Sequence, residues 1–92
     1  MIKENEIKVM KFPKAPKGKL KMPVYLIHNI DNYNFFIYRE ITKEESRDKK
    51  EYELLHHKDS IYLMIANTPS EENAMLAIKS YWQAILQLER IV

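Results

Sequence analysis

Residues 68–91 read TPSEENAMLAIKSYWQAILQLERI, and this stretch predicts an amphipathic helix from about residue 69 to residue 91. Thr68 can cap the helix with its hydroxyl, Pro69 suits the first helical position, and Glu71 completes a capping box. At about 100° per residue, the apolar side chains form one stripe. The stripe consists of Ala74, Ala77, Ile78, Tyr81, Ile85 and Leu88, with Trp82 at its flank and Leu76 pointing outward. We therefore expect a helix that packs one side against a core.

Two predicted β-hairpins precede this helix. Residues 24–30 and 35–41 are rich in β-branched and aromatic residues, which favours strands, and the Asp and Asn residues between them favour a turn. A second pair of strands is expected at 52–57 and 61–66, with a register that the weak Asp-Ser turn signal leaves open. The charged stretch 42–50 between the hairpins is expected to be a loop or one helical turn.

The N-terminal part offers one more strand, at residues 6–12, where apolar and polar residues alternate. The chain is then interrupted by Pro13, Pro16, Gly18 and Pro23. Residues 13–19 are therefore expected to be a loop, either the tip of a long hairpin or part of a mobile basic arm. The sequence predicts an α+β fold in which an antiparallel sheet of four to five strands packs on one C-terminal helix. Ninety-two residues suit a single domain, 1–92.

Charge is distributed unevenly along the chain. The net charge is only +2, but a Pro-containing basic segment at about residues 8–23 holds six lysines and no acid. These lysines are Lys8, Lys11, Lys14, Lys17, Lys19 and Lys21. This asymmetry favours binding to a polyanionic partner. The alternative interpretation is a solvated lysine-rich loop that aids solubility and protects a sheet edge.

The residues for catalysis or metal binding are sparse. The chain has no cysteine and a single glycine, Gly18, which excludes disulfides, thiolate zinc sites and a glycine-rich phosphate loop. His56 and His57 would point to opposite faces of a strand, and His28 lies in another strand, so no metal site is expected. We expect no catalytic site, no cofactor and no small-molecule substrate. Without a visible secretory signal or membrane span, a cytoplasmic location is expected.

The first predicted hairpin has two apolar faces. If residue 30 pairs with residue 35, one face carries Val24, Leu26, His28, Ile30, Phe35, Ile37, Arg39 and Ile41, and the other carries Tyr25, Ile27, Asn29, Phe36, Tyr38 and Glu40. The aliphatic face is expected beneath the helix, which leaves the aromatic face uncovered. Three alternatives stay open for it: the N-terminal segment, a homodimer, or a functional surface for nucleic-acid bases or a partner protein.

The function expected from these features is that of a small non-catalytic binding module. The basic segment would contact phosphates, and aromatic rings on the sheet would stack bases of a single strand with weak sequence specificity. Besides the six lysines, the expected binding residues are Tyr25, Phe36, Tyr38 and Tyr62. The alternative is a phage or mobile-element interaction protein that inhibits or adapts a host protein, such as an anti-defence inhibitor.

Overall fold

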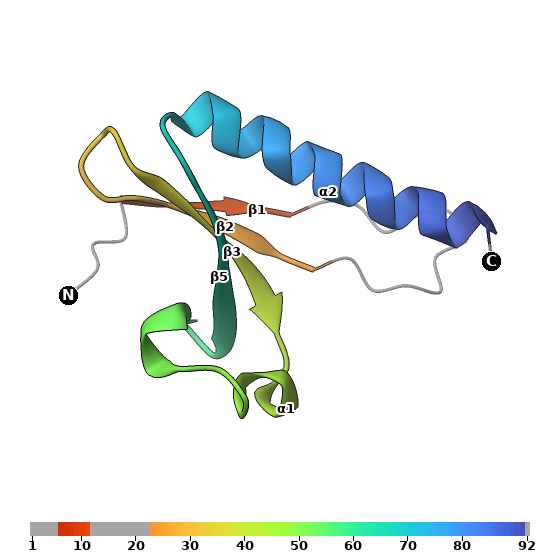
Figure 1. The fold of residues 1–92 in the computed structure, drawn as a ribbon, viewed down its shortest axis with the longest axis horizontal. Helices are drawn as coiled ribbons and strands as arrows, with labels where there is room; N and C mark the ends of the chain where they lie inside the picture. The colour runs from red at the N-terminus through yellow and green to blue at the C-terminus, as the bar shows by residue number, and fades with distance from the viewer. Residues whose placement is uncertain (1–5, 12–22, 92) are drawn as a thin grey trace.

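The computed structural model describes residues 6–11 and 23–91, which form an antiparallel five-stranded sheet and one long C-terminal helix (Figure 1). The elements are β1 (Ile7–Met10), β2 (Tyr25–Asn29), β3 (Phe35–Ile41), β4 (Leu54–His57), β5 (Ser60–Thr68) and α2 (Glu71–Ile91). Across the sheet the strands follow the order β1-β2-β3-β5-β4, so β1 and β4 are its edges. The predicted α+β fold, with two hairpins, an N-terminal strand and a C-terminal helix, is confirmed.

Two short helical turns join β3 to β4. The first, α1 (Lys43–Ser46), has a capping box in which the Thr42 hydroxyl accepts the Glu45 N–H, and the Glu45 carboxylate accepts the Thr42 N–H, both at 3.1 Å. The second is the 3-10 turn η2 (Glu51–Glu53). Of the two predictions for residues 42–50, the single helical turn is therefore correct.

The long helix α2 begins later than the sequence predicts because Ser70 caps it. The Ser70 hydroxyl oxygen accepts the Asn73 N–H at 3.1 Å. Thr68 is the last residue of β5, and its hydroxyl donates to the carbonyls of Phe35 and Ser70 at 3.2 and 3.0 Å. The prediction that Thr68 caps the helix is wrong, and its hydroxyl instead ties β5 to β3 and to the start of the helix.

The register of the first hairpin differs by one residue from the prediction. Asn29 pairs with Phe35, so the β2–β3 turn contains the five residues 30–34 rather than four. Asp31 accounts for the longer turn, because its carboxylate accepts backbone N–H groups inside it. A slip of one residue moves every side chain of a strand to the opposite face. The predicted faces are therefore wrong, because the β2 residues exchange sides relative to β3.

The helix packs on the face that carries the odd-numbered residues of β2 and β3. Ala74 and Ile78 of α2 are fully buried there. They form the helix-side core with Tyr25, Ile27, Phe35 and Ile37, and Met10, Ala66, Met75, Ala77 and Tyr81 pack around it. Leu76 is 57% exposed, which confirms that it points away from the sheet.

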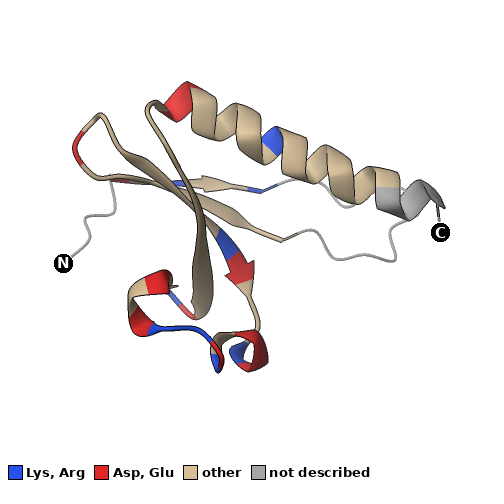
Figure 2. Cartoon of the chain, viewed as in Figure 1, with Lys and Arg blue, Asp and Glu red and all other residues tan. Residues whose placement is uncertain are grey.

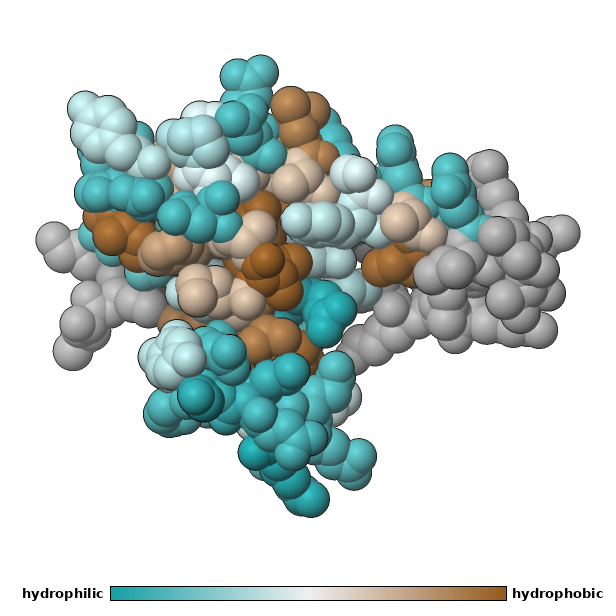
Figure 3. Space-filling model, in the orientation of Figure 1, coloured by the Kyte–Doolittle hydropathy of each residue, from teal (hydrophilic) through white to brown (hydrophobic). Residues whose placement is uncertain are grey.

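The opposite face of the sheet, called here the second face, forms a second core. Its buried residues are Leu26, Tyr38, Leu55 and Tyr62, with Ile7, Val24, Phe36 and Met64 packed against them. The sheet is strongly curled, and the β3–β5 register shifts at Ile37 and Tyr38, which is the mark of a bulge (Figure 1). All five strands contribute to this cluster. Figure 3 shows hydrophobic side chains gathered over β5 below α2, with hydrophilic ones over α1.

Candidate functional site

Tyr25 lies away from the other aromatic residues predicted to bind. The corrected register places it beneath α2, where it is 3% exposed and stacks on Tyr81 with ring centroids 6.0 Å apart. Burial raises the pKa of the Tyr25 phenol, although the positive charge of Arg39 acts in the opposite direction. In this position Tyr25 is part of the helix-side core and not of a surface for bases.

Phe36, Tyr38 and Tyr62 do share one face, but two of them are interior residues. Tyr38 is 8% exposed and Tyr62 is 6% exposed, while Phe36 is partly buried. Burial raises the pKa of Tyr38 and of Tyr62, and the carboxylate of Glu40 raises the pKa of Tyr62 further. Base stacking requires an open ring face. The second face therefore does not present the row of exposed rings that the sequence suggests.

Four of the six predicted lysines, at positions 14, 17, 19 and 21, lie outside the described residues. Lys8 and Lys11 are described, and both are exposed. The Lys8 ammonium lies 2.9 Å from a carboxylate oxygen of Glu71 and 3.7 Å from the sulfur of Met75. Because Glu71 begins α2, this ion pair connects the edge strand β1 to the helix. Lys8 therefore has a structural contact as well as an exposed charge.

The two ends of the basic segment are held together by the sheet. Met10, the last residue of β1, pairs with Tyr25, the first residue of β2. Residues 11–24 are thus the basic connection of an antiparallel hairpin, and these 14 residues include five lysines and no acid. Connections longer than about 12 residues are uncommon in small domains and are often functional.

A cleft of about 520 Å³ lies where β3, α1 and the β4–β5 turn meet. Its lining residues are Pro23, Arg39, Glu40, Ile41, Thr42, Lys43, Glu45, Asp59, Ser60 and Ile61. Glu40 accepts hydrogen bonds from the Val24 N–H at 3.4 Å and the Ser60 hydroxyl at 3.3 Å, so its carboxylate holds neighbouring strands together. Acidic and basic side chains mix around the cleft, so its charge favours neither an anion nor a cation.

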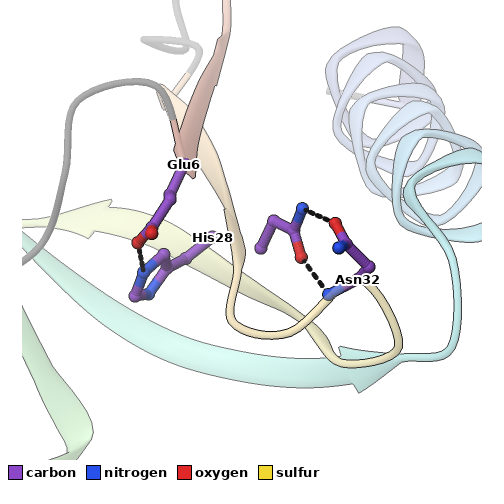
Figure 4. Close-up of polar contacts among 4 residues, drawn as sticks. Glu6, His28 and Asn32 are labelled. Carbon is purple, nitrogen blue, oxygen red and sulfur yellow. Dashed lines mark hydrogen bonds and ion pairs between the residues drawn. The ribbon is translucent and has the colours of Figure 1, made fainter.

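The histidines are not gathered into one site. His28 is buried, and its Nε2 lies 3.6 Å from a carboxylate oxygen of Glu6, the residue directly before β1 (Figure 4). His56 lies on the edge strand β4 and is exposed. Within residues 6–11 and 23–91, no group of three or more histidine or acidic side chains is arranged to hold a metal ion. The Glu6–His28 contact is best read as a link between β1 and β2.

The β2–β3 turn is a surface that the sequence reasoning missed. Tyr33 is 77% exposed and Ile30 is 47% exposed, although this turn is closely hydrogen-bonded. The Asn32 N–H donates to the side-chain oxygen of Asn29 at 2.7 Å, and the Asn29 amide donates back to Asn32 at 2.9 Å (Figure 4). The sequence did contain a signal for this surface, because Tyr33 is an aromatic residue among the turn-forming residues Asp31, Asn32 and Asn34.

Comparison with known proteins gives no relative for this chain: no family model, no curated protein and no solved structure matches it. Among the described residues, no helix combines the length and the apolar character needed to cross a membrane.

Proposed function

We propose that this protein is a small, cytoplasmic, non-catalytic module that binds nucleic acid through its basic connection. The observation that carries the proposal is the β1–β2 hairpin, in which paired Met10 and Tyr25 anchor 14 residues with five lysines and no acid. Lysines near phosphates displace condensed counterions, which provides affinity without base recognition. Met10 and Tyr25 are paired, so the two ends of this lysine-rich stretch start from neighbouring strands of the sheet.

Binding through phosphates is better supported than binding through stacked bases. Three of the four aromatic residues expected to stack are almost fully buried: Tyr25, Tyr38 and Tyr62. Lysine is a point charge without the planar fork that arginine uses to read guanine. We therefore expect weak sequence preference and a contribution to affinity from each lysine that decreases with salt.

Fluorescence anisotropy with a labelled single-stranded oligonucleotide and a labelled duplex tests this proposal. Affinity should fall as salt rises, with a logarithmic slope of about −0.7 per phosphate contact for a single strand. Changing Lys14, Lys17, Lys19 and Lys21 together to Glu should abolish binding. The matched control changes Lys43, Lys49, Lys50 and Lys58 to Glu, which removes the same charge outside the basic connection. Equal losses in both variants, or no binding by the wild type at about 50 mM salt, would exclude the proposal.

A second candidate function is capture of a host protein by a phage or mobile-element product that inhibits or adapts it. The exposed Tyr33 and Ile30 favour this candidate, since aromatic side chains on a firm turn are common anchors of protein interfaces. Under this alternative, the quadruple Lys→Glu variant should retain capture of the partner.

A homodimer through the sheet face also stays a prediction, and sedimentation mass tests it against the 11.1 kDa monomer.

A further inference from the structure

The β2–β3 turn exposes apolar side chains on a backbone that is held in place. The Asp31 carboxylate accepts the N–H groups of Tyr33 and Asn34 at 2.9 and 2.8 Å, and the Ile30 N–H donates to the Asn34 carbonyl at 3.0 Å. Asn32 adopts a positive φ of 69°, which its hydrogen bonds with Asn29 stabilise. The turn that carries Tyr33 is therefore already ordered before a partner binds.

The charge around this turn is negative. At this end of the sheet the described acidic residues are Glu6, Asp31, Glu71 and Glu72. The basic residue among them is Lys8, which pairs with Glu71. The start of α2 lies beside the turn, because Thr68 pairs with Phe35, and Figure 2 shows acidic residues at both places. The basic connection joins β2 at its other end, at Tyr25.

We infer that the β2–β3 turn docks on a protein whose surface has an apolar hollow for Tyr33 and Ile30 and a rim of Lys and Arg side chains. Charge complementarity selects this occupant. Phosphates would be repelled by the carboxylates, and a symmetric second copy would place carboxylates against carboxylates. Tyr provides a large contact area at low entropic cost, and the hydrogen-bonded turn lowers the cost further. The surface is independent of the basic connection.

Photo-crosslinking tests this inference in cells that produce the full chain. The photoreactive residue p-benzoylphenylalanine replaces Tyr33 in one variant and Tyr52, which is 73% exposed, in the matched control. A protein adduct is expected from position 33 and not from position 52. The crosslinked protein is then purified, and its affinity is measured by anisotropy for wild type, Ile30→Asp, Tyr33→Ala and Glu72→Lys.

Each of the three substitutions should weaken binding by about tenfold or more, and added salt should weaken binding of the wild type. Circular dichroism should show that the variants remain folded, since Ile30, Tyr33 and Glu72 are exposed. The inference is overturned by equal adducts from both positions, by an adduct with a second copy or with nucleic acid, or by no adduct. Unchanged affinity in Ile30→Asp and Glu72→Lys would also overturn it. Because the basic connection is intact in all these variants, nucleic-acid binding can be scored separately.

Discussion

At the scale of single residues, burial separates five of the six tyrosines into two groups, and Tyr81 is partly buried. Tyr25, Tyr38 and Tyr62 are interior residues, whereas Tyr33 and Tyr52 are exposed. Burial raises the pKa of the three interior phenols because a charged phenolate is poorly solvated there. Because of these three phenols, the free energy of unfolding should depend on pH in the alkaline range.

The sign of this coupling follows from the raised pKa values. Above pH of about 10 the unfolded chain loses phenolic protons that the native state retains, so the free energy of unfolding should decrease as pH rises. Urea denaturation at several pH values between about 9 and 12 measures it. Tyr38→Phe removes one such phenol and should flatten the pH dependence. An unchanged dependence in Tyr38→Phe would show that this phenol is not a buried titrating group.

At the scale of elements, the start of α2 depends on side chains that precede it. Ser70 caps the helix, and Thr68 joins β5 to β3 through the Phe35 carbonyl. Pro69 lies between these two residues, and it has no N–H to leave unpaired. The transition from strand to helix therefore takes place within two residues, and this places the first turn of α2 beside Lys8 of β1.

Replacing the cap measures its contribution. Ser70→Ala removes the acceptor of the Asn73 N–H and should lower the free energy of unfolding by about 1 kcal/mol. The matched control is Ser80→Ala, at an exposed position inside the helix, which should be neutral or slightly stabilising because Ala favours helices. Chemical denaturation followed by circular dichroism gives both values. Equal effects of the two substitutions would contradict the assignment of Ser70 as the cap.

At the scale of the whole molecule, one curled sheet supports two cores. The helix-side core and the second core share the strands β2 and β3, with Ile78 at the centre of one and Leu26 in the other. Both side chains have no exposed surface. Because neighbouring residues of the same strands enter opposite cores, the two clusters should unfold together.

Truncation in either core should therefore destabilise the whole protein. Ile78→Ala and Leu26→Ala should each cost about 2–5 kcal/mol, whereas Leu76→Ala at an exposed site should change stability by less than about 0.5 kcal/mol. Urea denaturation should show a single transition by circular dichroism and by fluorescence of Trp82. If the alanine variants do not fold, Ile78→Val and Leu26→Met provide milder changes. A negligible effect at Leu26 would mean that the second face is an open surface.

Much of the candidate site could be read from composition, but its geometry could not. The basic segment is visible as a run of lysines without acids, and the turn signals at Pro13, Pro16 and Gly18 indicate a connection. Strand pairing then shows that its two ends meet at Met10 and Tyr25. The set of stacking residues was less predictable, because burial depends on contacts between strands that are distant in sequence.

The sequence by itself determined the type and order of the elements, because periodicities of two and of about 3.6 residues distinguish strands from helices locally. It also predicted that α2 would cover a single face. Only the tertiary structure decided the register of the β2–β3 hairpin, which a five-residue turn around Asp31 sets. Alternation shows that neighbouring residues face opposite ways but not which way each faces, so one residue of slip placed Tyr25 under the helix. Packing between distant strands of the curled sheet, a long-range property, then buried Tyr38 and Tyr62 in the second core.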